Sequence, residues 1–159
     1  MSTIDPTNFP FRLREALRYH GWTARRLRDA AYLGESTVSH LLNNDALPRL
    51  STALAISEVV GFSLDALCGA SPLGWPDIEQ LAKPSHLAGS EWGSAVDLLC
   101  KLLGTTNVAH ATGTLVTTVS KMRRPPFPEP HLTTACPFAA ALGQQLHGMA
   151  LGKPARRSG

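Results

Sequence analysis

The chain has 159 residues, which is enough for one ordinary domain or two very small ones. Its 43% hydrophobic and 17% charged residues support a packed core and exclude wholesale disorder, while a net charge of +3 and a pI near 9.0 favour a polyanionic partner only weakly. The chain opens without a signal-peptide pattern and has no apolar run near the roughly 20 residues that span a bilayer, so we expect a cytoplasmic protein without a membrane partner.

The first predicted elements are a short arm and a helix. Residues 1–10 are polar and interrupted by prolines, which is typical of an N-terminal arm. A helix is predicted over residues 11–20, and Gly21 ends it. Its inner face is formed at helical spacing by Leu13, Ala16, Leu17 and His20.

Two short helices joined by a tight turn are predicted next, over TARRLRDAAYLGESTVSHLLNN at residues 23–44. The first begins at Thr23, whose hydroxyl can accept a bond from an orphaned backbone N–H, and ends near residue 31. The second covers about residues 35–42, with Gly34 before it and an Asn-Asn stop after it. The apolar residues that can share one core are Leu27, Ala31, Val38, Leu41 and Leu42.

The other face of the second helix is polar. Short polar side chains there suit base edges and phosphates better than they suit a core. This pattern predicts a helix-turn-helix in which residues 35–42 form the recognition helix. The polar residues are Ser36, Thr37, Ser39 and His40.

A loop closed by Pro48 leads to a helix predicted over residues 51–60, which Gly61 ends. Ser63 caps a last short helix, which is complete at Gly69. Residues 11–69 are therefore predicted to form one five-helix domain. The inward side chains of the 51–60 helix are Leu54, Ala55, Ile56 and Val59.

Residues 11–68 resemble the five-helix DNA-binding domain of the Cro/C1 (XRE-type) repressor family. The shared signatures are Gly-x-Thr before the second helix, Ser-Thr-Val-Ser in the third, the Asn-Asn stop, the proline before the fourth, and Gly-Phe-Ser-Leu-Asp-x-Leu at the end. They cover a little over a third of the chain. The resemblance implies a repressor that binds double-stranded DNA.

Three positions depart from the family pattern. Ala24 stands where the family often has a DNA-contacting Gln, and Arg28 stands where a small residue is usual. Tyr32 stands where glycine is usual, so the turn is expected to be shaped differently or to be shifted toward Gly34. These departures affect the base contacts more than the fold.

Residues 70–90 are rich in proline and glycine and are predicted to form a linker. Within it, Pro76 and the acids that follow favour a helical turn or two over residues 76–83. Trp75, Ile78 and Leu81 would dock that turn onto a neighbour. A clear helix follows over residues 90–103, with an inner stripe of Trp92, Val96, Leu99 and Leu103.

The second half of the chain repeats the first. A shift of 81 residues places Ser36-Thr37-Val38-Ser39 on Thr117-Thr118-Val119-Ser120, and one inserted residue later Leu50 falls on Leu132. Residues 91–150 are therefore predicted to be a second, smaller helix-turn-helix-like domain, followed by a flexible basic tail at 151–159. Ala109 and Gly113 supply the small residue and the turn glycine that the first copy lacks.

The second copy leaves two interpretations open. Leu115 and Val116 begin its recognition helix, and Lys121, Arg123 and Arg124 end it. Apolar contacts with thymine methyl groups and cationic contacts with phosphates would allow it to bind DNA. Alternatively, the copy is a structural or dimerising domain whose basic cluster is a solvated helix end.

The predicted DNA contacts fall into three groups. Base or near-base contacts are predicted for Glu35, Ser36, Thr37, Ser39 and His40, although Thr37 could instead pack beside Val38. Phosphate contacts in the first copy are predicted for Arg25, Arg26, Asn43 and Arg49. Contacts in the second copy are predicted for Thr117, Ser120, Lys121, Arg123 and Arg124.

The predicted fold is all-α, and the predicted function is sequence-specific transcriptional repression. A linker of about twenty residues spans over 60 Å at ~3.3 Å per residue, so one monomer could read an asymmetric, bipartite site in two successive major grooves. The alternatives are a homodimeric repressor with a C-terminal dimerisation domain, and an antitoxin or adaptor that binds protein. The layout resembles immunity repressors of temperate actinobacteriophages, which implies maintenance of lysogeny in a bacterial host.

No catalytic or metal-binding set is recognisable. The six histidines lack metal-ligand spacing, and there is neither a glycine-rich phosphate loop nor a GxSxG motif, so we predict no enzymatic activity, no metal and no cofactor. The three cysteines, Cys68, Cys100 and Cys136, are far apart in sequence and are predicted to be buried thiols. Exposed surface charges are predicted for Glu15, Asp29, Glu58 and Asp65.

Overall fold

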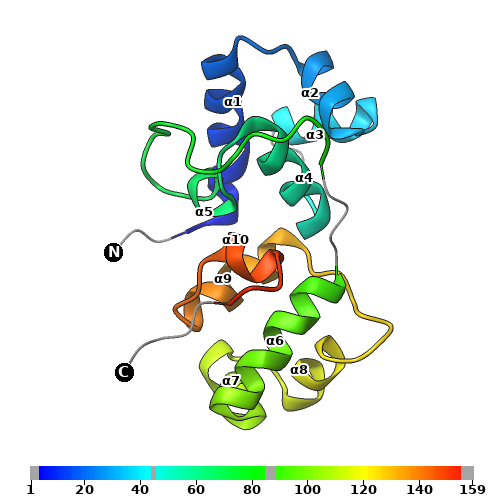
Figure 1. Cartoon of the computed structure of the whole chain (residues 1–159), viewed down its shortest axis with the longest axis vertical. Helices are drawn as coiled ribbons and strands as arrows, with labels where there is room; N and C mark the ends of the chain where they lie inside the picture. Colours follow the sequence, from blue (N-terminus) through cyan, green and yellow to red (C-terminus); the bar gives the residue numbers. More distant parts are fainter. Residues whose placement is uncertain (1–3, 44–45, 85–88, 155–159) are drawn as a thin grey trace.

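Figure 1 shows a computed structural model of the chain, which describes residues 4–43, 46–84 and 89–154. Within these residues the secondary structure is ten α-helices, one 3-10 turn and two isolated β-bridges, with no strand, so the all-α prediction is confirmed. Parts of the predicted arm, Asn-Asn stop, linker and basic tail lie outside the described residues, at 1–3, 44–45, 85–88 and 155–159.

The helices form two groups of five. The first unit consists of a 3-10 turn, η1 (Pro6–Asn8), and the helices α1 (Phe9–His20), α2 (Ala24–Ala31), α3 (Glu35–Leu42), α4 (Leu50–Val60) and α5 (Leu64–Leu67). The second unit consists of α6 (Gly89–Leu103), α7 (Thr105–Thr112), α8 (Val116–Met122), α9 (Leu132–Ala141) and α10 (Leu146–Ala150). The helices predicted at 11–20, 23–31, 35–42, 51–60 and 90–103 are all present, with ends that differ by at most two residues.

Local chemistry explains several helix ends. The hydroxyl of Thr23 accepts a hydrogen bond from the backbone N–H of Arg26 at 3.1 Å, and the hydroxyl of Ser63 accepts one from Ala66 at 3.1 Å. Both predicted N-caps are therefore confirmed. Gly61 ends α4 in the left-handed region with φ of 79°, where a side chain would be strained.

The turn between α2 and α3 is not shifted toward Gly34, whose φ is −74°. Tyr32 itself adopts the left-handed conformation, with φ of 55°, and donates its N–H to the carbonyl of Arg28. Its side chain is 62% exposed. At the matching position of the second unit, Gly113 has φ of 65°, which confirms its predicted role as the turn glycine. A non-glycine residue in this region costs roughly 1–2 kcal/mol.

The burial pattern shows how the two units correspond. Trp92 in α6 is buried like Phe9 in α1, and Val96 like Leu13, each 83 residues later. Leu132 at the start of α9 is buried like Leu50 at the start of α4, which is 82 residues earlier. The predicted inward position of Leu103 is wrong, because its side chain is 49% exposed and the buried face of α6 turns toward Ala95 and Cys100 instead.

The predicted linker helix is absent. Residues 70–84, here called the strap, are irregular and lie along the first unit, where the N–H of Leu73 bonds the Glu15 carboxylate at 2.9 Å. Farther along, the N–H of Leu81 bonds the carbonyl of Glu58 at 2.8 Å. The prolines break the helical pattern, and the backbone finds its partners on α1 and α4 instead. Ile78 and Leu81 are half-buried, but the predicted docking of Trp75 is wrong, because it is 83% exposed.

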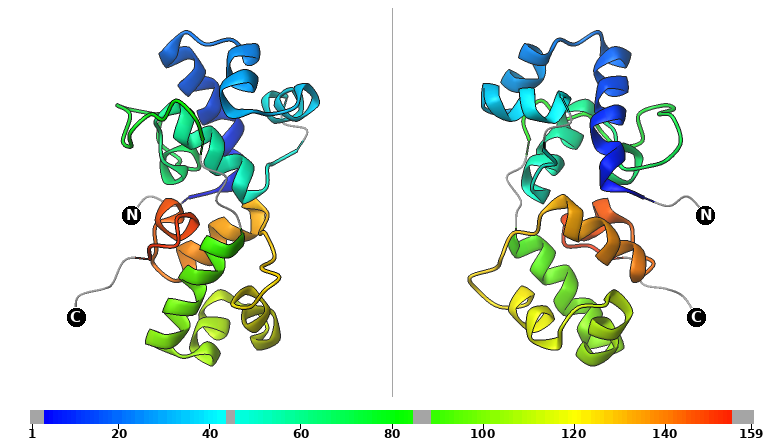
Figure 2. Two further views of the ribbon diagram at one scale, coloured as in Figure 1. Left: turned by 45° about the vertical axis from the view of Figure 1, so that its right-hand side comes forward. Right: turned by 180° about the vertical axis from the view of Figure 1, so that it is seen from behind.

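The two units pack against each other, as both views in Figure 2 show. At the starts of α4 and α9, the N–H of Leu50 bonds the carbonyl of Pro130, and the N–H of Leu132 bonds the carbonyl of Pro48, each at 3.0 Å. These reciprocal bonds join equivalent residues, so an approximate two-fold relation passes near the bridge between Arg49 and His131. The expectation of two heads on an extended tether is therefore wrong for this structure.

A second reciprocal set completes this junction. The Asp65 carboxylate accepts hydrogen bonds from the backbone N–H groups of Leu146 at 2.8 Å and His147 at 2.9 Å, and thereby caps α10. In return, Nδ1 of His147 accepts the N–H of Leu64 at 3.2 Å. Glu129 likewise accepts the N–H of Ser51 at 2.9 Å. The predicted role of Asp65 as an exposed surface charge is wrong, because it bonds the partner unit.

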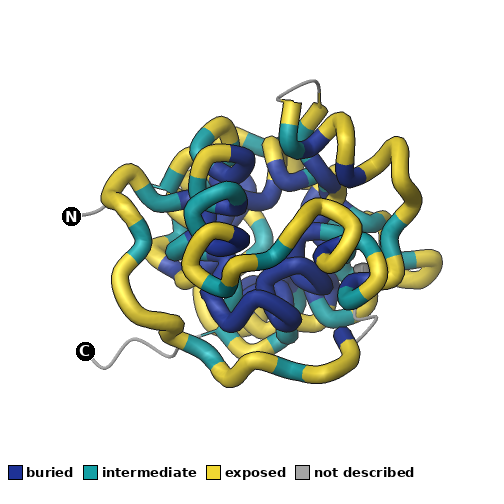
Figure 3. Tube along the Cα trace, turned by 90° about the horizontal axis from the view of Figure 1, so that it is seen from above, coloured by how far each residue is buried: buried dark blue, intermediate teal, exposed yellow. Residues whose placement is uncertain are grey.

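The cores of the two units meet at this junction. In Figure 3, which looks down the long axis, the buried trace lies in the centre and the exposed trace surrounds it. Helix α4 contacts both α9 and α10, and the strap covers another face, so Glu58 is only 7% exposed and its predicted surface position is wrong. Glu15 is half-buried beneath the strap, whereas Asp29 is exposed as predicted.

The three cysteines are free thiols and all are buried, as predicted. The fold brings two of them together, because Sγ of Cys68 and Sγ of Cys136 are 3.5 Å apart. None of the described helices is long and apolar enough to cross a membrane.

Candidate nucleic-acid interface

Two helices, α3 and α8, lie on the same side of the molecule, one in each unit (Figures 1 and 2). Each is anchored by two buried side chains, which are Val38 and Leu41 in α3 and Val119 and Met122 in α8. The remaining face of each helix is turned toward solvent. One side of the protein therefore exposes two short helices, each fixed to the core by its buried side chains.

The exposed face of α3 collects all of the predicted base-contacting residues. Thr37 is exposed, so the alternative in which it packs beside Val38 is wrong. The side-chain amide of Asn43 donates to the hydroxyl of Ser39 at 3.4 Å, which links the end of the helix to its polar face. The exposed residues are Glu35, Ser36, Thr37, Ser39, His40 and Asn43.

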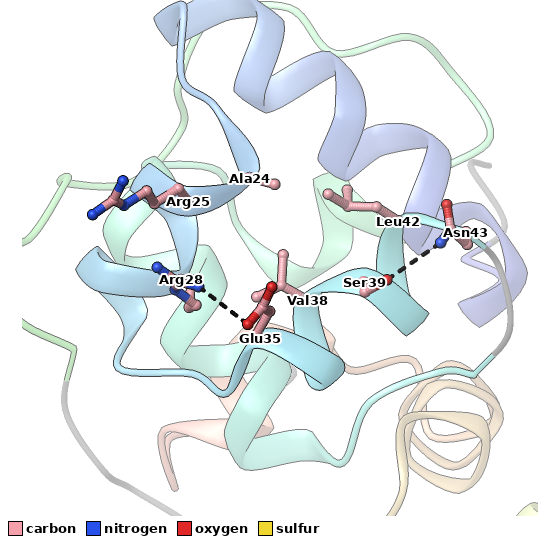
Figure 4. A pocket seen from close by; sticks show the side chains of 8 residues that line it. All are labelled: Ala24, Arg25, Arg28, Glu35, Val38, Ser39, Leu42 and Asn43. Carbon is pink, nitrogen blue, oxygen red and sulfur yellow. Dashed lines mark hydrogen bonds and ion pairs between the residues drawn. The ribbon is translucent and has the colours of Figure 1, made fainter.

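A cavity of about 560 Å³ lies between α2 and α3. Figure 4 shows its lining, to which α2 contributes Ala24, Arg25 and Arg28 and in which Arg28 reaches toward Glu35 of α3. Arg28 was not among the predicted contacts, and its guanidinium lies 3.9 Å from the Glu35 carboxylate, an exposed pair that contributes little to stability.

The three cations of the first unit that were predicted to contact phosphates, Arg25, Arg26 and Arg49, are exposed. Arg25 and Arg26 lie at the start of α2, and the guanidinium of Arg26 stands 5.2 Å from the centroid of the Trp22 ring. A cation–π contact of this kind holds the guanidinium without neutralising its charge. Arg49 is exposed beside the junction, so the cations extend from α2 toward the second unit.

The cations at the end of α8 divide into two kinds. Arg123 is tied to α6 and α7, because two of its guanidinium nitrogens each lie 2.8 Å from Oδ1 of Asp97 and a third donates to the Thr105 hydroxyl at 2.7 Å. Hydrogen bonds from Lys101 and Arg123 hold the pKa of Asp97 below its ordinary value. Arg123 is therefore part of the fold, in contrast to its predicted phosphate contact.

Lys121 and Arg124 remain on the surface of the second unit. Both line a cavity of about 430 Å³ together with Pro125, Pro126 and Pro128. Nε of Arg124 donates to the carbonyl of Ser120 at 3.3 Å. Thr117 is exposed beside them, whereas Ser120 is half-buried.

The beginning of α8 is apolar where the beginning of α3 is polar. Leu115 is 73% exposed and Val116 is 45% exposed. The matching positions of the first unit are occupied by Gly34 and Glu35, which are also exposed. The two helices therefore present the same shape with different chemistry.

The junction residues were missed by sequence reasoning. Asp65 and His147 are equivalent positions in the repeat, 82 residues apart, and that relation was the only signal in the sequence that they belong together. Burial lowers the pKa of His147, which keeps its Nδ1 available as an acceptor.

Among the described residues, no group of three or more His, Cys, Asp or Glu side chains could hold a metal ion. Comparisons with protein-family models, with curated proteins and with solved structures give no match. The function is therefore inferred from the chemistry of the two exposed helices and from the way in which the junction holds them.

Proposed function

We propose that this protein is a sequence-specific, double-stranded DNA-binding transcriptional repressor that reads one bipartite site as a monomer. The observation that carries the proposal is the repeated pair of exposed helices, α3 and α8, presented on one side of two docked units. In this proposal the pairs α2–α3 and α7–α8 are helix-turn-helix motifs. The first unit would then belong to the Cro/C1 (XRE-type) family that its sequence resembles.

The side chains of α3 suit the major groove. Hydroxyl, imidazole and carboxylate groups can exchange hydrogen bonds with base edges, and exposed guanidinium groups on α2 can bind phosphates on either side. A helix fits the major groove of B-DNA, which is about 12 Å wide, when its other face is held by a core. Val38 and Leu41 supply that anchorage.

The two helices would read different sequences. Glu35 and His40 give α3 charged and polar contacts, whereas Leu115 and Val116 give α8 apolar groups that suit thymine methyls. Lys121 and Arg124 would hold phosphates beside α8. An asymmetric site follows from this difference, and the general rule for paired helix-turn-helix units places its half-sites about one helical turn or ~34 Å apart.

The junction supports a monomer. In a single-headed repressor, two chains pair to present two recognition helices. Here the α4, α5, α9 and α10 surfaces already pair within one chain, through bonds such as Leu50 to Pro130 and Leu132 to Pro48. One chain thus has the arrangement of a dimer. Because its layout resembles that of actinobacteriophage immunity repressors, we propose that the protein silences lytic promoters.

The test is selection of double-stranded DNA from a random library with the full chain, followed by light scattering of the complex. We expect an asymmetric, two-part consensus bound one-to-one. A two-to-one complex on a palindrome would replace this proposal with the homodimeric alternative. Absence of any sequence enrichment would remove DNA recognition altogether.

A second candidate function follows from the exposed apolar start of α8. Leu115 and Val116 are the kind of side chains that bury themselves in a protein partner, as an antitoxin or adaptor would require. In that case the selected DNA would contain only the half-site of α3. Leu115→Ser and Val116→Ser would then leave DNA affinity unchanged and abolish capture of the protein partner.

A further inference from the structure

Cys68 and Cys136 face each other across the junction of the two units. Cys68 follows α5 in the first unit, and Cys136 lies in the middle of α9 in the second. Both side chains are fully buried, and the two sulfur atoms are 3.5 Å apart although 68 residues separate them in sequence. The prediction of buried thiols far apart in sequence did not include this contact, which the packed junction creates.

The backbone around each sulfur is fixed. The carbonyl of Cys68 accepts hydrogen bonds from the N–H of Asp5 at 2.8 Å and from the side-chain amide of Asn8 at 3.2 Å. Cys136 is held by the helical bonds of α9, within the contact between that helix and α4. A disulfide has an S–S length of about 2.05 Å, so side-chain rotation has to close roughly 1.5 Å.

We propose that Cys68 and Cys136 are an oxidisable pair that forms a disulfide between the two units and fixes the junction covalently. The oxidant is a low-molecular-weight disulfide such as oxidised glutathione. A thiolate of the pair attacks one sulfur of the oxidant, whose S–S bond breaks and releases one glutathione thiolate. The second thiolate attacks the mixed disulfide and releases the other glutathione. The protein loses two protons and two electrons, and the oxidant becomes two thiols.

The closed junction protects the pair. Both sulfurs are buried, so an oxidant in solution does not reach them while the units are docked. A hydrogen bond with Cys136 and burial also raise the pKa of the Cys68 thiol above its ordinary value, which keeps Cys68 protonated. Oxidation therefore proceeds when the units part, and its rate follows the frequency of opening. Once formed, the disulfide prevents further opening until a reductant removes it.

Cys100 provides an internal control. It is also buried, and burial raises the pKa of its thiol, but it lies on α6 beside Arg123 and Thr105 and away from the junction. It shares burial with the pair, but its neighbours are the Arg123 guanidinium and the Thr105 hydroxyl and not a second thiol. The Cys100→Ser variant keeps the pair and removes the competing thiol.

The experiment treats the reduced full chain and its Cys100→Ser variant with oxidised glutathione in urea concentrations below the unfolding transition. Remaining thiols are alkylated, and the products are mapped by mass spectrometry. We expect the Cys68–Cys136 disulfide in both proteins, with the loss of two hydrogen atoms and with a rate that rises with urea. Cys100 should remain alkylatable in the parent chain.

The thermal transition supplies the second measurement. The disulfide should raise the Tm by roughly 5–10 °C, and a reductant should reverse the rise. Cys136→Ala should abolish both the disulfide and the rise; if that variant does not fold, the peptide map of the parent chain still decides. Two results would overturn the proposal. In the first, glutathione stays attached to Cys68 or Cys136 as a mixed disulfide. In the second, Cys68 and Cys136 can still be alkylated after Cys100 has reacted with the oxidant.

Discussion

The two units share a scaffold but differ at their surfaces. Buried positions are occupied by equivalent apolar residues, such as Phe9 and Trp92 at the starts of the first helices. The exposed helices differ, because Gly34 and Glu35 stand at the start of α3 where Leu115 and Val116 stand at the start of α8. A repeated core therefore leaves the exposed faces free to change, which is the condition for one chain to recognise two different half-sites.

The surroundings of the units differ as well. The strap covers the first unit and bonds Glu15 on α1, whereas Leu98, which follows Glu15 by 83 residues on α6, is exposed. At the junction, in contrast, the two units make equivalent contacts. Asp65 of the first unit accepts a backbone N–H of the second, and His147 of the second unit accepts a backbone N–H of the first.

The largest expected effect on stability is at the junction. Asp65→Ala removes the acceptor of two backbone N–H groups at the start of α10 and should lower the free energy of unfolding by about 2–3 kcal/mol. Urea denaturation measures this. The matched control is Asp29→Ala, an exposed acid, which should change stability by less than ~0.5 kcal/mol. Equal effects of the two variants would refute the structural role of Asp65.

The adjacent cations Arg123 and Arg124 should behave oppositely. Arg123→Ala breaks the bonds to Asp97 and Thr105 and should destabilise the protein by about 1–2 kcal/mol, since the ion pair is only partly shielded from solvent. Arg124→Ala should leave stability within ~0.5 kcal/mol but weaken binding to all DNA sequences, with a salt slope lower by about one unit. Thermal melts and DNA titrations at several salt concentrations distinguish them. The reverse pattern would mean that the two side chains exchange roles.

Both turns should be more stable with glycine at the left-handed position, so opposite exchanges at Tyr32 and Gly113 should have opposite effects. Tyr32→Gly relieves a left-handed residue and should stabilise the first unit by roughly 0.5–1 kcal/mol, because part of the ~1–2 kcal/mol gain is offset by a more flexible unfolded chain. Gly113→Ala introduces the same strain into the second unit and should destabilise it by about 1 kcal/mol. Denaturation of both variants checks the pair. A destabilised Tyr32→Gly would show that the exposed ring contributes more than the strain costs.

The smallest expected effect is a pH dependence at the junction. The folded pKa of His147 lies below its ordinary value of 6.5, so the unfolded chain binds a proton more readily in the interval between the two values. Stability should be complete above about pH 6.5 and should fall as the pH drops toward the folded pKa. His147→Asn keeps an acceptor for the N–H of Leu64 and should flatten this part of the profile. An unchanged profile would assign the dependence to other groups.

The helices could be predicted because their signals are local. Thr23 and Ser63 cap the helices that follow them, and glycines end others, so residues within one turn decide these boundaries. The repeat was visible because buried positions keep their spacing. Proline and acid at residues 76–77 also resemble a helix start. The backbone N–H groups of the strap instead form hydrogen bonds with α1 and α4, and these distant partners cannot be recognised from the local sequence pattern.

The candidate site could be predicted only in part. Exposure of the polar face of α3 follows from helical periodicity, and all predicted residues on that face are exposed. The fixed role of Arg123 does not follow, because Asp97 is 26 residues away and Arg124 looks equivalent in sequence. The contacts of Asp65 with α10, and of Cys68 with Cys136, require two units to pack in one orientation, and no spacing rule encodes that.

The central claim is that one chain reads two half-sites at a fixed separation because its units are docked. The most direct measurement compares affinity for the selected site with affinity for the same site carrying about five extra base pairs, roughly half a helical turn, between its halves. The docked structure predicts that affinity falls to that of a single half-site, because α8 then faces the wrong side of the duplex. Unchanged affinity would mean that the junction opens on DNA and that the units act as tethered, independent heads.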